Sequence, residues 1–295
     1  MSRLAISLLL AATALGQTRV RKADIQVLST MLTDNNGIGE WGFAAMVDVD
    51  GRRILFDTGA RPDTVSKNLG ELKVDLAGVT DVILSHNHGD HTGGLMTLRR
   101  DAMPRDAKAL SRAHVGKGIF APRQGWMAKV RAEYEATGAK FVEHDSFAEV
   151  APGVWLTGPV PRKHPERNWS GSDNVPEDMS MVLDTPEGLV LISGCGHAGI
   201  INTVEHARHK FGARPLVAAI GGFHLFPASD ENLDWTAAKL KEFGLRNFLG
   251  AHCTGIEATY RIREKAGLSR KTCVVGAVGA RFTLGTGISP GNVAR

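Results

Sequence analysis

The stretch VTDVILSHNHGDHTGG, residues 79–94, joins a short apolar run to a dense group of polar side chains. The residues up to Leu84 predict a buried strand. The strand leads into a glycine-rich turn with three histidines and an aspartate within six positions: His86, His88, Asp90 and His91. The turn is either a polar surface loop that contains histidine by chance or a metal site, and the other histidines of the chain discriminate between the two.

The spacing of these residues suits metal binding. In an extended or turning backbone, residues two positions apart point the same way, so we expect His86 and His88 to bind one ion. Asp90 and His91 then turn toward a neighbouring position. Neutral imidazole and carboxylate are ligands that zinc and other divalent first-row metals accept. Two such ions about 3.5–4 Å apart share one hydroxide and lower the pKa of the bridging water.

Three further histidines follow apolar strands in the same way. His197 lies in GCGHAG after LVLIS, His224 lies in GGFH after VAAI, and His252 lies in AHCTG after FLGA. In open α/β sheets ligands gather beyond the carboxyl ends of the strands, where rigid strands hold converging loops. One such histidine would be unremarkable, but together with His86 there are four, and they predict a shared site.

Periodicity and turn residues predict an α/β chain. Residues 41–59 and 179–193 are each typical of a hairpin, the first with a tight turn at Asp50 and Gly51. Strands and helices alternate after each hairpin, which favours a layered fold. Helices are expected at residues 62–74 (capped by Asp63), 126–137, 199–212, 230–244 and 255–267, and further strands at residues 23–32, 79–86, 140–144, 154–158, 215–221 and 247–252.

Composition and the first residues bear on location and partners. The chain has 295 residues, 43% hydrophobic, with a net charge of +4, and its scattered basic residues give little support for nucleic-acid binding. Residues 1–16 predict a secretory leader, because Arg3 is followed by an apolar run and then by small residues suited to signal peptidase. The apolar run is shorter than the roughly 20 residues of a membrane-spanning helix. The alternative is a buried N-terminal helix or strand. We expect one domain at residues 17–295, a periplasmic or secreted location, and no other segment that spans a membrane.

The motif HNHGDH at residues 86–91 has the H-x-H-x-D-H form of the metallo-β-lactamase superfamily, and ILFDTG at residues 54–59 resembles its first motif. The resemblance covers nearly the whole mature chain. It implies an α/β fold, the four-layer αβ/βα sandwich (metallo-β-lactamase fold), with the site between two sheet edges. The later motifs GCGHAGIINTVEHA, IGGFHL and AHCTG look like the branch that includes the archaeal dihydropterin ribofuranosylaminobenzene phosphate synthase and many bacterial metal-dependent hydrolases.

The resemblance also implies one or two bound ions, with Zn²⁺ expected and iron or manganese as alternatives. Asp57 would orient the histidine loop from behind the ligands, unless it is only a turn-forming residue ahead of Gly59. Asp90 is also expected to accept or donate the proton in catalysis. His224 is either a substrate-facing acid or oxyanion donor, or a structural residue. The implied ligands are His86, His88 and His197 for the first ion, and Asp90, His91 and His252 for the second.

The chain departs from the superfamily pattern at one ligand. The common pattern has a bridging aspartate at a strand end downstream of the third histidine, and this sequence offers none. Asp230 and Asp234 fall at the start of a predicted helix, where capping or the helix dipole explains them. Cys195 follows the strand LVLIS, and it is either a thiolate ligand in the bridging place or a small buried residue of the turn. A single occupied metal site is the alternative to two.

These features predict an enzyme: a metal-dependent hydrolase that uses a metal-activated water or hydroxide on an ester, lactone, amide or phosphoester. The alternatives are a transferase resembling the synthase of the branch and a non-catalytic metal-binding protein. An exported protein rarely meets cytoplasmic pterin intermediates, so the leader favours hydrolysis. The expected partner is a small molecule, anionic if the stretch with Arg162, Lys163, His164 and Arg167 forms a cationic lip rather than a solvated loop. A disulfide between Cys253 and Cys273 is compatible with export.

Overall fold

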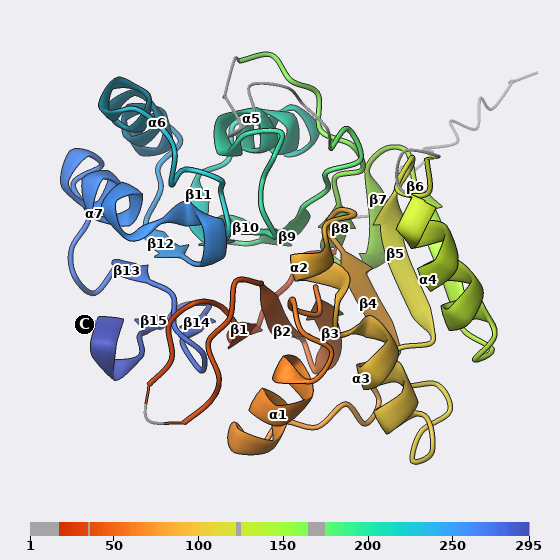
Figure 1. The fold of residues 1–295 in the computed structure, drawn as a ribbon. Coiled ribbons are helices and arrows are strands. Elements are labelled where there is room, and N and C mark those ends of the chain that lie inside the picture. The colour runs from red at the N-terminus through yellow and green to blue at the C-terminus, as the bar shows by residue number, and fades with distance from the viewer. Residues whose placement is uncertain (1–17, 35, 122–124, 165–174, 295) are drawn as a thin grey trace, which may run out of the picture.

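Two mixed β-sheets pack face to face, with helices on the outer face of each (Figure 1). The computed structural model describes residues 18–34, 36–121, 125–164 and 175–294. The leader predicted at residues 1–16 lies outside these ranges. Within them, no helix has both the length and the apolar character that crossing a membrane requires.

The first sheet has eight strands in the described part of the chain. Its middle strands β3, β4, β5 and β6 run parallel to one another, whereas the remaining pairs are antiparallel. In spatial order the strands are β15 (Gly287–Ser289), β14 (Arg281–Thr283), β1 (Ala23–Ser29), β2 (Ala44–Val49), β3 (Arg52–Phe56), β4 (Asp81–Leu84), β5 (Arg112–Gly116) and β6 (Lys140–His144).

The second sheet has seven strands among the described residues, and β10 to β13 form its parallel part. The whole of β10 is buried, which explains its continuous apolar sequence, because strands covered on both faces need no polar side. In spatial order the strands are β13 (Cys273–Val275), β12 (Asn247–Gly250), β11 (Leu216–Gly221), β10 (Gly188–Ser193), β9 (Met181–Thr185), β8 (Val154–Leu156) and β7 (Ala148–Ala151).

Three hydrophobic cores separate four layers. One core lies between the sheets and takes side chains from both, such as Phe56 and Ile220. The second lies under the helices on the second sheet, and the third lies under the helices on the first sheet (Figure 1). These helices are α5 (Ile200–Phe211), α6 (Asp230–Glu242) and α7 (Ile256–Lys265) on the second sheet, and α1 (Thr64–Glu71), α3 (Leu95–Ala102) and α4 (Gly125–Glu135) on the first. The fold is the αβ/βα sandwich that the resemblance implied.

The local predictions hold for both hairpins. Asp50 and Gly51 join β2 to β3 with φ of 51° and 84°, the left-handed pair that a tight hairpin turn requires. Asp63 stands at the predicted N-terminus of α1, but its side chain makes no capping hydrogen bond and pairs with Lys67 instead. At α6 the capping side chain is that of Ser229.

The parallel strands position the site. Because neighbouring parallel strands end at the same sheet edge, the turns after β3 and β4 lie together, as do the turns after β10, β11 and β12. Residues far apart in the sequence therefore converge there.

Candidate metal centre

The predicted site residues all lie in the segments that follow the parallel strands β3, β4, β10, β11 and β12. A short helix α2 (Gly89–Thr92) carries the last two residues of the histidine cluster, and a 3-10 turn η2 (His252–Thr254) begins with the last histidine. The residues and their strands are Asp57 after β3, His86 after β4, Cys195 and His197 after β10, His224 after β11, and His252 after β12.

The backbone is strained at three of these positions. Asp57, His224 and His252 have φ of 56°, 49° and 47°, in the left-handed region that residues other than glycine rarely adopt. Only six non-glycine residues of the described chain have positive φ, and half of them stand here. Such conformations persist where the surrounding structure enforces them, and they concentrate at functional sites.

The carboxylate of Asp57 hydrogen-bonds residues of the histidine cluster and so orients them. Its Oδ1 accepts a hydrogen bond from the backbone N of Ser85 at 2.7 Å, and its Oδ2 accepts one from Ser85 Oγ at 2.8 Å. The same Oδ2 lies 2.8 Å from Nδ1 of His91. A carboxylate only accepts, so Nδ1 of His91 carries the proton and Nε2 presents its lone pair to the site.

Ser85 extends this control to His86. Its Oγ lies 2.9 Å from Nδ1 of His86 and donates its own hydrogen to Asp57. Ser85 Oγ therefore accepts from Nδ1–H, which leaves Nε2 of His86 unprotonated. That Nε2 is buried and has no hydrogen-bond partner within the described residues. A buried polar atom without a partner is costly, and a metal ion would satisfy it.

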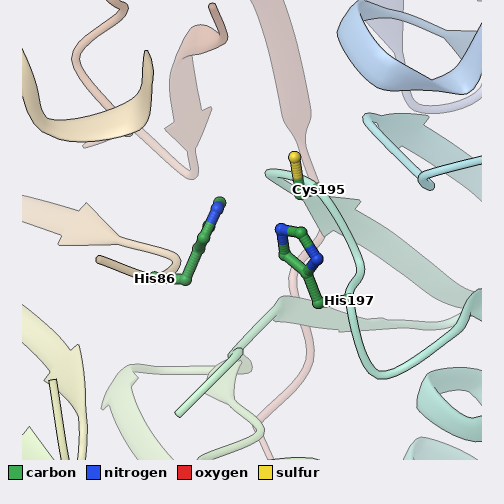
Figure 2. A group of neighbouring side chains, drawn as sticks. All are labelled: His86, Cys195 and His197. Carbon is green, nitrogen blue, oxygen red and sulfur yellow. The ribbon is translucent and has the colours of Figure 1, made fainter. Parts of the chain in front are cut away.

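The first predicted ligand group is assembled in the structure. The ring centroids of His86 and His88 are 4.6 Å apart, and His197 lies 4.7 Å from the first and 4.8 Å from the second. His86 enters from the first sheet and faces His197 and Cys195, which enter from the turn after β10 (Figure 2). Neither ring nitrogen of His197 has a hydrogen-bond partner in the described part of the chain.

His86 and His197, the two buried histidines of the first ligand group, are neutral at physiological pH. Burial, reinforced by neighbouring imidazoles, holds the pKa of His86 well below its ordinary value. The same two causes lower the pKa of His197 to about 2. Neutral imidazole is the form that binds a metal ion.

The second predicted ligand group is also assembled. Nε2 of His252 lies 3.3 Å from Nε2 of His91 and 3.3 Å from Oδ2 of Asp90. Burial alone would raise the pKa of Asp90, but the hydrogen bond with His252 and the electrostatic interaction with the neighbouring histidines outweigh burial and hold the pKa well below its usual range. Burial likewise opposes protonation of His252, yet Cys253 and Asp90 raise its pKa to about 10. The surroundings of the second ligand group therefore stabilise positive charge, which favours binding of a cation there.

Cys195 lies between the two groups. Its Sγ is 3.3 Å from Nε2 of His91, and it could hold an ion either with His86 and His197 or with His91 and His252. A third possible group is His86, Asp90 and His91. Within each group the ligand atoms lie within 4.8 Å of one another.

The donor set fits a divalent transition metal. Imidazole, carboxylate and thiolate together suit zinc and its neighbours in the periodic table, whereas calcium and magnesium prefer oxygen ligands alone. The buried ring nitrogens that have no partner in the described ranges are the structural sign that such an ion belongs here.

The three cysteines are free, and their arrangement differs from the suggested pairing. Cys253 lies beside Cys195, with the two Sγ atoms 3.2 Å apart. Cys273 donates from its Sγ to the backbone O of Thr259 at 3.3 Å instead. A second thiol therefore stands next to the candidate ligand, which sequence reasoning did not foresee.

Two carboxylates that support the site were also missed. Glu40, buried ahead of β2, accepts hydrogen bonds from Ser29 Oγ and from the backbone N of Ala60 and so fixes the loop after Asp57. Asp178 is buried, its Oδ2 accepts from the backbone N of Ala198 at 3.0 Å, and burial raises its pKa to about 7. Asp178 lies shortly before the apolar strand β9 (Met181–Thr185), and this position was the available signal.

Several residues lie away from the centre. Nε2 of His164 lies 3.0 Å from the carboxylate of Glu205, so this histidine contacts α5, whereas Arg167 of the expected cationic lip lies outside the described residues. Asp230 is the first residue of α6 and Asp234 lies in its second turn, and both pair with Arg261. His224 does lie beside the centre, with its ring centroid 4.7 Å from that of His197 and its Nδ1 buried without a partner among the described residues.

The chain is similar to several known proteins. The family model of the metallo-beta-lactamase superfamily matches residues 42–179. The chain is 27% identical over 248 residues to the 7,8-dihydropterin-6-methyl-4-(beta-D-ribofuranosyl)-aminobenzene-5'-phosphate synthase of Methanocaldococcus jannaschii, covering 76% of this chain and 84% of that protein. An uncharacterized protein of the same archaeon is 27% identical over 250 residues, covering 79% of this chain and 93% of that protein.

Solved structures agree as well. Tm1679, a metal-dependent hydrolase of the beta-lactamase superfamily, superposes with a TM-score of 0.68 at 26% identity, covering 88% of this chain and 98% of that one. YhfI of Bacillus subtilis has the same fold, with a TM-score of 0.57 at 13% identity over 89% of this chain and 99% of that one. Residues 42–179 therefore match the metallo-beta-lactamase superfamily, and the chain adopts the fold of that superfamily.

Proposed function

We propose that this chain is a metal-dependent hydrolase acting on an ester, lactone, amide or phosphoester of a small molecule. The observation that carries the proposal is the convergence of two ligand groups on Cys195, with buried ring nitrogens that have no partner among the described residues. A cluster of purely structural histidines would not leave so many buried ring nitrogens unsatisfied.

Each ligand group would bind one metal ion in this proposal. His86, His88 and His197 would hold one ion, and the second group, formed by Asp90, His91 and His252, would hold another. Cys195 would serve both. A divalent ion bound there supplies Lewis acidity toward a carbonyl or phosphoryl oxygen and lowers the pKa of coordinated water.

Two residues of the chain would handle protons and charge. Asp90 is ionised, its side chain is 20% exposed, and its Oδ2 faces the site, so it would accept a proton from the attacking water and return it to the leaving group. His224 is half-buried beside His197, and it would donate a hydrogen bond to the oxygen on which negative charge develops.

The proposal is tested first by elemental analysis of the mature protein, purified without chelator or added metal. One or two zinc, iron or manganese ions per chain are expected. A panel of chromogenic esters, lactones and phosphoesters should then include at least one substrate whose turnover a chelator abolishes and metal restores. Metal uptake with no turnover across the panel would instead favour a metal-binding protein.

The second candidate is a transferase resembling the archaeal synthase, and the 27% identity over 84% of that protein favours it. A transferase of this kind would bind pterins and leave simple chromogenic esters intact. Equilibrium binding of a pterin, measured beside the hydrolysis panel on one preparation, separates the two candidates.

We also propose that residues 1–16 direct export and are removed. Mass spectrometry of the protein from the expressing cell should show a chain that begins near residue 17, whereas an intact Met1 would contradict export. We expect weak or absent penicillin turnover, because one fold supports many chemistries. Efficient hydrolysis of several β-lactams would refute this last expectation.

A further inference from the structure

Two exposed aromatic side chains stand against the metal centre. Trp41 is 50% exposed and Phe226 is 43% exposed, and their ring centroids are 5.7 Å apart at an interplanar angle of 85°. The ring of Trp41 lies 5.1 Å from that of His252, and the ring of Phe226 lies 5.4 Å from that of His224. A row of rings therefore leads outward from the candidate ligands to the protein surface.

This pair differs from an ordinary exposed hydrophobic residue. Single apolar side chains on a protein surface need no explanation, and Trp126 on α4, 42% exposed, is such a case. Trp41 and Phe226 come from segments far apart in the sequence, yet they contact each other and both contact histidines of the site. Exposed apolar surface next to a reaction centre is typical of a ligand-binding wall.

The backbone holds Trp41 in place. The residue before it, Glu40, is buried, its carboxylate is hydrogen-bonded, and its N donates to the backbone O of Thr30 at 3.0 Å. A Cβ added at Gly42, the residue after it, would come within 2.9 Å of the backbone O of Asp90. The tryptophan is thus exposed between two closely packed neighbours.

Phe226 is held in a similar way. Its backbone N donates to the backbone O of Cys253 at 3.2 Å. A Cβ added at Gly255 would lie only 3.0 Å from the Cβ of Phe226, so η2 packs directly against this residue. Rings that are already positioned lose little freedom when a ligand binds, which favours affinity.

We propose that Trp41 and Phe226 form a subsite for an aromatic ring of the substrate. The inference rests on the proposed function only in placing the reacting bond at the metal centre. An edge-to-face pair offers a third ring both an edge and a face, the arrangements that aromatic groups prefer. A cationic group, the other ligand that aromatic faces attract, is disfavoured because the adjacent centre itself takes a cation.

The test compares two ligands that share a tetrahedral anionic head and differ in the ring: phenylphosphonate and methylphosphonate. Their affinities for the metal-loaded protein are measured by calorimetry. The wild-type protein should bind phenylphosphonate about tenfold more tightly. Trp41→Ala and Phe226→Ala should each lose most of this preference, and Trp41→Phe should retain part of it. Trp126→Ala, which removes an equally exposed tryptophan elsewhere, should retain all of it.

Equal affinities in the wild-type protein, or a full preference in both alanine variants, would overturn the inference. A dimer that both alanine variants dissociate, with no preference for the phenyl group, would make the surface a contact between two copies and would overturn it too. A phenyl preference without turnover of any substrate would support the subsite while removing the hydrolase. Turnover of a substrate without the phenyl preference would support the hydrolase and overturn the aromatic subsite.

Discussion

Oδ2 of Asp57 lies 2.8 Å from Nδ1 of His91, and the same oxygen accepts the hydroxyl hydrogen of Ser85. Since Ser85 Oγ also contacts Nδ1 of His86, one buried carboxylate orients a histidine in each of the two ligand groups. Asp57 therefore links the two ligand groups through hydrogen bonds to their histidines, and Cys195 links them a second time because it lies between them.

Asp57→Asn should weaken metal binding at both groups. An amide at this position has one acceptor oxygen in place of two and adds two hydrogens that face Nδ1–H of His91 or the hydrogen donors of Ser85. Loss of such an outer contact typically lowers metal affinity about 10–100-fold. Competition against a chromophoric chelator measures the change. Asp145→Asn, at a carboxylate with 68% side-chain exposure, is the control and should leave the affinity unaltered. An unchanged affinity in Asp57→Asn would refute the orienting role.

Cys195→Ala should reduce the number of ions bound or their affinity, because this thiol belongs to both candidate groups. In the cobalt-substituted protein, the thiolate-to-metal charge-transfer absorption should disappear with the substitution. Cys273→Ala removes a buried thiol whose Sγ donates to the backbone O of Thr259 and which belongs to neither ligand group, so it should leave the absorption intact. A cobalt spectrum that is the same in both variants would assign Cys195 to packing.

The strand-end histidines show how much one sequence could predict. His86, His197 and His252 each follow a strand whose apolar run is visible in the sequence, and parallel strands bring such ends together. The hairpin at Asp50 and Gly51 was equally visible, because its turn residues encode their own geometry. The four-layer packing and the division of ligands into two groups came from family resemblance, since periodicity alone does not say which sheet packs on which.

The contacts that were missed join segments far apart in the sequence. Cys253 stands beside His252 in the chain, but its approach to Cys195 depends on how the turns after β10 and β12 meet. Trp41 precedes β2, and its half-exposed contact with Phe226 joins two segments far apart in the sequence. Such relationships follow from tertiary packing, which local hydrophobic patterns do not encode.

Gly194→Ala should disrupt the centre from the second sheet. A Cβ at this position would collide with Ser85 Oγ and Asp57 Oδ2, two atoms already fixed by hydrogen bonds. Overpacking of this kind costs about 1–3 kcal/mol in the free energy of unfolding, and here it should also lower metal affinity. Thermal unfolding and chelator competition measure the two effects.

Gly70→Ala is the matched control for this substitution. Gly70 lies in α1, its Cβ would meet no atom within 4 Å, and a helical alanine is favoured over glycine by about 1 kcal/mol. The control variant should be slightly more stable and should bind metal normally. A Gly194→Ala protein as stable as wild type, with normal metal affinity, would show that the turn after β10 adjusts freely.

Asp81, at the start of β4, should make stability fall in acid. Burial alone would raise its pKa, but His114, Arg112 and Arg52 outweigh burial and hold the pKa well below its ordinary value. A carboxyl whose folded pKa lies below its unfolded value of about 3.9 stabilises the protein above that value, and the contribution disappears as pH falls toward the folded pKa.

Asp81→Asn should therefore cost roughly 1–3 kcal/mol in the free energy of unfolding at pH 7, where the charged hydrogen bonds of the carboxylate are lost. The difference in stability between the two proteins should narrow between pH 4 and lower values, because wild-type Asp81 also loses its charge there. Urea unfolding across this range measures the difference, and the metal ligands protonate alike in both proteins. A difference that stays constant down to the acid limit would mean that the carboxylate charge contributes nothing and that only the shape of the side chain matters.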